Sequence, residues 1–82
     1  MIDELLTPRE REVIKLIALG FSNKEITEKL YISDSTRQTH YMSIMQKLNV
    51  SHDKKFDMSV KRLRVALLYL KEHKELINEI GF

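Results

Sequence analysis

The segment "SNKEITEKLYISDSTRQTHYMSIMQKL", from Ser22 to Leu48, decides the fold of this 82-residue chain. Ser22 and Glu25 have the spacing of a capping box, which predicts a short helix over about 23–30. Ser33 is placed to cap a second helix, and Asp34 in its first turn complements the helix dipole. The segment therefore predicts two helices in close succession, joined by the three residues 31–33.

The second of these helices has two unlike sides. At about 100° per residue, Tyr41, Ile44 and Leu48 share one side, with Met45 at its edge and Arg37 on the same line. The opposite side carries short or amide side chains and one methionine, namely Ser35, Gln38, Thr39, Met42 and Gln46. An uncharged side of this kind suits close approach to a hydrogen-bonding surface, and the DNA major groove accepts such a helix.

Further helices are expected before and after this pair. Thr7, Pro8 and Glu10 form a second capping box with a proline at the first helical position, so a helix is predicted over about 8–19, ended by Gly20. A last helix should begin near Met58 and run to about residue 79. The predicted fold class is all-α: one four-helix helix-turn-helix domain over residues 1–82, with the helix-turn-helix at about 23–48 and an extended C-terminal helix at about 58–79.

Composition argues against several classes of protein. The chain has no cysteine, and the spacing of its three histidines does not match that of metal ligands, so neither a metal nor a cofactor is expected. No serine stands with a histidine and a carboxylate in a recognisable catalytic arrangement, so the chain is not expected to be an enzyme. No apolar run approaches the roughly 20 residues needed to span a bilayer, and the acidic start is unlike a signal peptide. We expect a soluble, cytoplasmic protein without membrane contact.

Positive charge gathers in the middle of the chain. Seven basic and two acidic residues lie between Arg37 and Arg64, a local net charge of +5, whereas the whole chain carries +2. A polyanion could be attracted to this part of the surface, but a solvated helix face would give the same pattern. Charge alone does not separate the two interpretations.

The motifs then resemble a known family. The stretch "LTPREREVIKLIALGFSNKEITEKLYIS" from Leu6 to Ser33, with Thr36, His40, Ile44 and the "KLNV" that ends at residue 50, resembles the LuxR/GerE-type DNA-binding domain. This family includes the output domains of many bacterial response regulators. The resemblance implies a transcription regulator that binds double-stranded DNA.

The resemblance also implies roles for individual residues. The positions that lie along the DNA backbone in the family correspond here to Ser22, Asn23, Lys24, Thr36, His40 and Lys47. The positions that contact bases correspond to Gln38, Thr39 and Met42, which are also on the polar side found from helical angle. Ser35 on that side and Arg37 complete the predicted DNA-binding set. Gln38 could pair with the N6 and N7 edge of adenine, and Met42 could pack on a thymine methyl group.

Two departures from the family pattern matter. Arg37 and Gln38 stand where the family usually has valine followed by a basic residue. An arginine cannot be buried unpaired without large cost, so we expect its stem to pack while its guanidinium reaches a phosphate, in preference to a structural ion pair. The second departure is the polar loop after Val50, which we interpret as a surface loop, with phosphate contacts by Lys54 and Lys55 as the alternative.

The last helix is predicted to have two apolar stripes. One contains Val60, Leu63, Leu67, Leu70 and Ile77, and the other contains Val65, Tyr69, Leu76 and Ile80. A small monomer needs one stripe for its core, so the other should meet a second copy. We predict a homodimer with an interface of Val60, Leu63, Leu67, Leu70 and Tyr69. The alternative is that the C-terminal tail folds back and covers both stripes.

Three functions are consistent with these patterns. The favoured one is a sequence-specific bacterial transcription regulator that binds DNA as a homodimer through its third helix. The second is an interaction module of the same fold that engages another regulator or RNA polymerase without binding DNA. The third, a small structural helical protein, leaves the polar side of the third helix unexplained.

Overall fold

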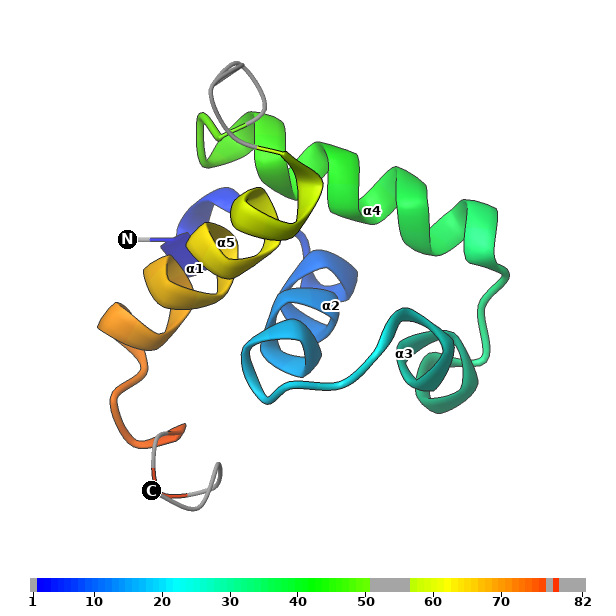
Figure 1. The fold of residues 1–82 in the computed structure, drawn as a ribbon, viewed down its shortest axis with the longest axis horizontal. Helices are drawn as coiled ribbons and strands as arrows, with labels where there is room; N and C mark the ends of the chain where they lie inside the picture. Colours follow the sequence, from blue (N-terminus) through cyan, green and yellow to red (C-terminus); the bar gives the residue numbers. More distant parts are fainter. Residues whose placement is uncertain (1, 51–56, 77, 79–82) are drawn as a thin grey trace.

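The computed structural model describes residues 2–50, 57–76 and 78. The described part of the chain is helical, without strands, which confirms the all-α class. The helices are α1 (Ile2–Leu5), α2 (Pro8–Ala18), α3 (Asn23–Leu30), α4 (Asp34–Lys47) and α5 (Met58–Glu72) (Figure 1).

Capping residues set where α2 and α3 begin. The Glu10 backbone N–H donates to Thr7 Oγ1 at 3.2 Å, and the Thr7 backbone N–H donates to Glu10 Oε1 at 2.9 Å. Ser22 and Glu25 repeat the pair of bonds at 3.2 and 2.9 Å. Both predicted capping boxes are therefore confirmed, and each satisfies two backbone donors at its helix start.

The turn between α3 and α4 closes on a residue in a left-handed conformation. Tyr31 has φ 55° and ψ 46°, and the Ile32 N–H donates to the Thr27 carbonyl at 3.1 Å. Ser33 then caps α4, with its hydroxyl accepting from the Thr36 N–H at 3.1 Å. The predicted three-residue connection is confirmed, and it sets α4 across α3 (Figure 1).

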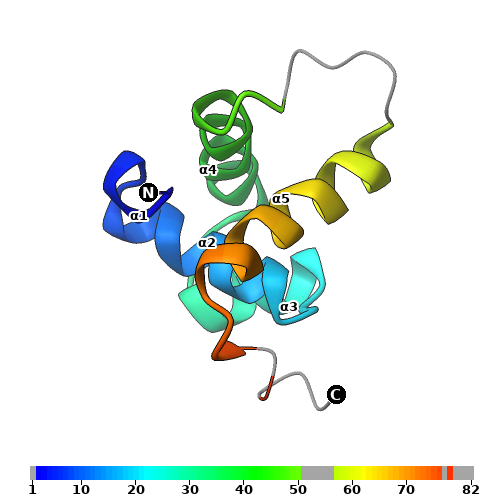
Figure 2. The ribbon, with the colours of Figure 1, turned by 90° about the vertical axis from the view of Figure 1, so that its left-hand side faces the viewer.

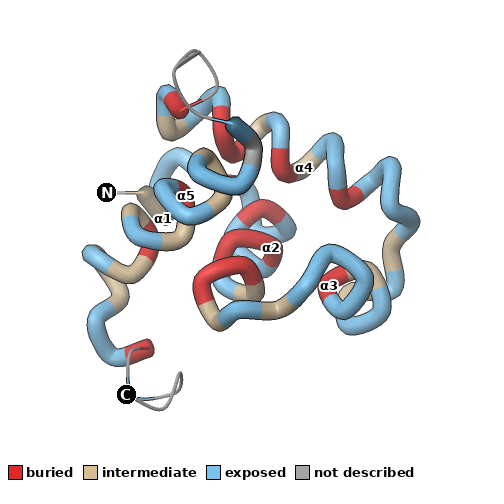
Figure 3. The backbone as a smooth tube through the Cα atoms, viewed as in Figure 1, coloured by how far each residue is buried: buried red, intermediate tan, exposed pale blue. Residues whose placement is uncertain are grey.

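Helix α2 is the centre of the domain. It packs against α4 on one side and α5 on the other, while α3 packs mainly against α4 (Figures 1 and 2). Each of the four longer helices places a fully buried side chain in the core: Ile14, Ile26, Ile44 and Val65. Only one side of α4 takes part, and its other side is exposed along its length (Figure 3).

The structure corrects the expected ends of the fold. A one-turn helix, α1, precedes the first predicted helix, and its Ile2 N–H donates to the Glu72 carboxylate at 2.8 Å. The last helix ends at Glu72 and not near residue 79, because His73 leaves helical geometry with φ −124° and ψ 60°. The His73 ring stacks on Tyr69 with ring centroids 4.2 Å apart. Leu76 then turns back into the buried core that contains Val65 and Tyr69 of α5.

None of the described helices is long and apolar enough to cross a membrane.

Candidate nucleic-acid interface

The polar side of α4 faces outward. Gln38, Thr39 and Met42 are exposed, whereas Tyr41 and Ile44 on the opposite side are buried in the core. Because the buried side fixes how the helix is rotated, the exposed side is presented in one orientation. A helix held in this way can enter a groove without losing its packing.

Most of the predicted DNA-binding residues are accessible. His40 is partly exposed, and the exposed members of the set are Ser22, Asn23, Lys24, Ser35, Thr36, Gln38, Thr39, Met42 and Lys47. They lie on α4 and on the start of α3, which α4 crosses in the helix-turn-helix. The structure therefore leaves the residues that were predicted to contact phosphates and bases accessible, with Arg37 as the exception.

Arg37 is buried and has a protein partner. Arg37 is 7% exposed, and its Nε donates to Asp34 Oδ1 at 2.8 Å. This is the structural ion pair that the sequence analysis ranked second, and it forms because Asp34 lies one helical turn earlier on the same side. The hydrogen bond from Arg37 lowers the pKa of Asp34 below its usual value, which keeps the carboxylate charged.

Asp34 also accepts a hydrogen bond from Gln38, whose amide group was predicted to contact a base. Gln38 Nε2 donates to Asp34 Oδ2 at 2.9 Å. A bidentate contact with adenine uses both ends of the amide, so Gln38 would have to release Asp34 to make it. Sequence reasoning placed Asp34 only as a residue of the first helical turn and missed this contact, which the spacing of four residues could have indicated.

Lys47 is engaged inside the protein. Its Nζ lies 2.7 Å from Glu10 Oε1, and the Glu10 side chain is 5% exposed. Burial raises the pKa of Glu10, but hydrogen bonds from Lys47, Ser43 and Thr7 lower it more, to about 2. The ion pair ties the end of α4 to the start of α2. The Lys47 side chain is 35% exposed, so a phosphate that bound its ammonium group would compete with Glu10.

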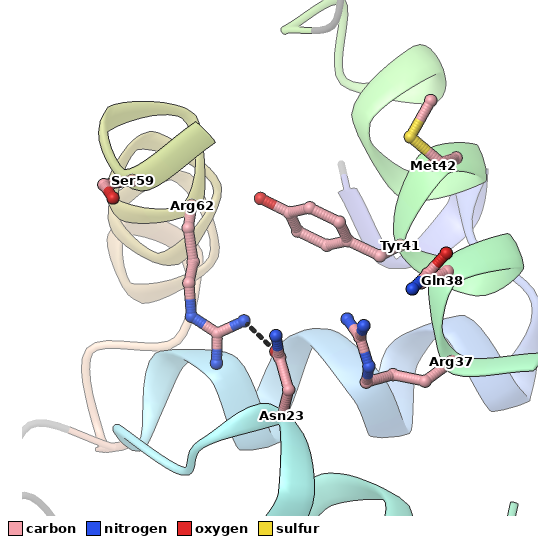
Figure 4. Close-up of a pocket in the computed structure, with 7 residues that line it drawn as sticks. All are labelled: Asn23, Arg37, Gln38, Tyr41, Met42, Ser59 and Arg62. Atoms are coloured by element: carbon pink, nitrogen blue, oxygen red, sulfur yellow. Dashed lines mark hydrogen bonds between the residues drawn. The ribbon is translucent and has the colours of Figure 1, made fainter. Parts of the chain in front are cut away.

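The start of α3 is joined to α5 by an arginine that sequence reasoning did not single out. Arg62 donates to the Asn23 side-chain oxygen at 2.7 Å (Figure 4) and to the Phe21 carbonyl at 2.6 Å. These bonds fix Asn23, a predicted phosphate contact, against the last helix. The concentration of basic residues in this part of the chain was the only sequence signal for Arg62. Its pairing with Asn23 could not be predicted, because the two residues are 39 positions apart.

One apolar stripe of α5 is left uncovered. Leu63 and Leu67 are 59% and 57% exposed, Val60 is also exposed, and Leu70 is partly buried. The inclusion of Tyr69 in the predicted interface was wrong, because Tyr69 lies on the other stripe and is buried against the core and His73. The stripe that remains exposed contains Val60, Leu63 and Leu67.

The remaining predictions concern metal ligands and residues that the structure does not describe. Among the residues that the structure describes, no three histidine, cysteine, aspartate or glutamate side chains are grouped so that they could hold a metal ion. The proposed phosphate contacts of Lys54 and Lys55 lie outside the described residues, as do the predicted stripe members Ile77 and Ile80.

The helix-turn-helix segment matches a known family. Residues 4–56 match the family described as "Bacterial regulatory proteins, luxR family", which covers more than half of the chain. The chain belongs to the luxR family. The match includes α2, α3 and α4, and so takes in the exposed side of α4. This luxR-family chain is thus a helix-turn-helix domain of transcription regulators, and the family is one of regulators rather than enzymes.

Curated relatives match the same segment of the luxR-family domain. The oxygen regulatory protein NreC of Staphylococcus carnosus is 52% identical over 46 residues, which are 56% of this chain and 21% of NreC. The transcriptional regulatory protein DegU of Brevibacillus brevis is 49% identical over 47 residues, 57% of this chain and 20% of DegU. LiaR of Bacillus subtilis, another transcriptional regulatory protein, is 52% identical over 48 residues, 58% of this chain and 23% of LiaR.

The domain therefore spans only about a fifth of the length of these relatives. No solved structure matches the chain.

Proposed function

We propose that this luxR-family domain binds double-stranded DNA in the bacterial cytoplasm as a homodimer and regulates transcription, with α4 of each copy in the major groove. The exposed side of α4 carries the proposal. Gln38, Thr39 and Met42 are accessible while the opposite side of the helix is buried, so base edges can approach these three side chains without unfolding. The names of the relatives, which are regulatory proteins, support the same assignment.

In this proposal the start of α3 grips the DNA backbone. Ser22, Asn23 and Lys24 are exposed at the N-terminus of α3, where backbone N–H groups and the helix dipole favour an anion. Thr36 and His40 on α4 contact the backbone beside them. Phosphate contacts of this kind set the orientation of the domain, and the polar side of α4 supplies the sequence preference.

The homodimer forms through the exposed stripe of α5. Val60, Leu63 and Leu67 lie at helical spacing and would lose their contact with water on pairing with a second copy. Two copies related by a twofold axis would present two α4 helices to an inverted repeat.

The second candidate is an interaction module that engages another regulator or RNA polymerase without binding DNA. Two ion pairs within the chain favour this candidate: Arg37 is paired with Asp34, and Lys47 is paired with Glu10. Both pairs reduce the charge available to a polyanion. The exposed stripe of α5 would then bind the partner protein.

Selection of bound fragments from random-sequence DNA separates the two functions. The regulator should enrich a defined motif, whereas the interaction module should enrich none. Gln38→Ala should then lower discrimination at one base pair of that motif by about 1 to 3 kcal/mol and leave affinity for unrelated DNA nearly unchanged. Fluorescence anisotropy with the selected duplex and its single-base variants measures this. Equal loss on every sequence would contradict a base contact by Gln38.

A further inference from the structure

A pocket lies between α4, α5 and the start of α3, beside the polar side of α4. It has a volume of about 360 Å³. Arg37 and Tyr41 reach into it from α4, Arg62 reaches in from α5, and Asn23 lies between the two guanidinium groups (Figure 4). Gln38, Met42 and Ser59 complete its lining. We call this the Arg37–Arg62 pocket.

The charges of the pocket are unbalanced. Two guanidinium groups line it, and none of its described lining residues is acidic. Asp34 neutralises Arg37 at Nε, but Arg62 is held by the neutral oxygens of Asn23 and Phe21. Burial lowers the pKa of Arg62, Tyr41 opposes this, and the nearby charge of Arg37 adds to the lowering, which is the direction expected for a positive charge held next to another. An anion between the two groups would offset the repulsion between them.

A buried hydroxyl group at the pocket also lacks a partner. Tyr41 is 6% exposed, and among the described residues its hydroxyl makes no hydrogen bond. Its ring extends from α4 toward Arg62 (Figure 4). Burial raises the pKa of Tyr41, against the opposing charges of Arg62 and Arg37, so the hydroxyl keeps its proton and can donate. Buried donors without an acceptor are uncommon in folded proteins, and each calls for an explanation.

We propose that the Arg37–Arg62 pocket binds a phosphate group through the two guanidinium groups and the Tyr41 hydroxyl. Guanidinium forks match the oxygens of a phosphate, and a tetrahedral anion can accept from three donors, two on α4 and one on α5, that converge on one pocket. The hydroxyl is buried and Tyr41 lines the pocket, so an incoming oxygen atom would reach it through movement of the partly exposed Arg62 side chain. The volume leaves room for the atoms attached to the phosphate.

The pocket proposal does not depend on DNA binding, and its first test uses the chain alone. The side-chain Nε–H resonances of Arg37 and Arg62 are followed by NMR during titration with inorganic phosphate, with chloride and acetate at equal ionic strength as references. We expect saturable shifts in phosphate that chloride and acetate do not reproduce. Absence of saturation, or an equal response to acetate, would overturn the proposal.

Three variants show whether the donors act as proposed. Tyr41→Phe keeps the buried ring and should weaken phosphate binding about fivefold, the size expected for one hydrogen bond, without loss of stability. Arg37→Met keeps an apolar stem and should weaken binding by at least about tenfold. Lys71→Gln removes an exposed charge from the end of α5 and should leave binding unchanged. If Tyr41→Phe and Arg37→Met bind phosphate like the parent chain, the pocket is not the site.

A second test identifies the source of the phosphate. In the duplex obtained by selection, single backbone phosphates are replaced one at a time by neutral methylphosphonates. If the pocket holds a DNA phosphate, one replacement should weaken binding as much as Tyr41→Phe does, and the two changes should not add. If it holds a free phosphorylated compound, inorganic phosphate should bind to the DNA complex without displacing the duplex.

Discussion

At the scale of single residues, Glu10 is a buried carboxylate whose charge is held by its neighbours. Lys47 Nζ and the Thr7 N–H both contact its Oε1, at 2.7 and 2.9 Å. These bonds outweigh the effect of burial and lower the pKa of Glu10 from 4.5 to about 2. A carboxyl group whose folded pKa is lowered stabilises the fold fully above its unfolded pKa. That contribution is lost as the pH falls from about 4.5 toward 2.

Glu10→Gln should therefore lower the free energy of unfolding at neutral pH by roughly 3 kcal/mol and flatten its pH dependence between about 4.5 and 2. Glutamine can still complete the capping box, so the change removes mainly the charge. Urea unfolding followed by circular dichroism at several pH values measures both effects. Glu12→Gln, which alters an exposed ion pair with Arg9, is the control. Equal losses in the two variants would show that the Glu10–Lys47 pair contributes nothing particular.

The two lysines predicted to contact phosphates should behave differently. Lys24 is exposed at the start of α3, so Lys24→Ala should reduce the slope of log affinity against log salt by about one and leave stability nearly unchanged. Lys47→Ala would also leave the Glu10 carboxylate buried without its partner, so it should lower stability as well. Anisotropy titrations over a range of salt, with urea unfolding of each variant, separate the two effects. A Lys24→Ala slope equal to that of the parent would argue against a backbone contact there.

Residue roles could be predicted from the sequence only where helical angle decides them. The rotation of α4 follows from its apolar side, so the exposure of Gln38, Thr39 and Met42 was predictable. Contacts between residues that are distant in sequence were not predictable. Lys47 and Glu10 are 37 positions apart, and Arg62 and Asn23 are 39 apart, and no periodicity connects them.

At the scale of helices, the starts of α2 and α3 were predictable, whereas α1 and the end of the last helix were not. Thr7 and Ser22 have capping partners three residues later, and this local chemistry fixed the starts of α2 and α3 as observed. The end of α5 has no glycine or proline to mark it, and the apolar spacing continues beyond it. Helix α5 stops at Glu72 because His73 stacks on Tyr69 and Leu76 enters the core, which are tertiary contacts.

The uncovered stripe of α5 leads to a prediction about assembly. Leu63→Glu with Leu67→Glu should convert the proposed dimer into a monomer that keeps its helical content, because both side chains are already exposed in the single copy. Sedimentation equilibrium at high micromolar concentration measures the mass, and circular dichroism checks the fold. Leu5→Glu, at a leucine of similar exposure on α1, is the matched control. A parent chain that sediments as one copy would contradict the dimer, and a control that also dissociates would move the interface away from α5.

At the scale of the whole molecule, the helix that would form the dimer is joined directly to the surface that would bind DNA. Arg62 of α5 donates to Phe21 and Asn23 at the start of α3, and α2 packs against both α4 and α5. The two α4 helices of a dimer would therefore keep a fixed separation, because the Arg62 hydrogen bonds and the packing of α2 hold α5 against the helix-turn-helix core. A rigid pair of this kind requires its half-sites at one spacing.

The spacing between the half-sites thus tests whether the two copies bind DNA as one rigid body. In the duplex recovered by selection, an insertion of about 5 bp between the half-sites rotates one of them to the far side of the helix, since a turn contains about 10 bp. Affinity should fall to that of a single half-site. The Leu63→Glu, Leu67→Glu variant should bind both duplexes equally and no more tightly than the parent binds one half-site. Gel-shift titrations of the parent and the variant on the two duplexes compare these affinities. If the parent tolerates the insertion without loss, the two copies are not held as one rigid body, and the inverted-repeat geometry is wrong.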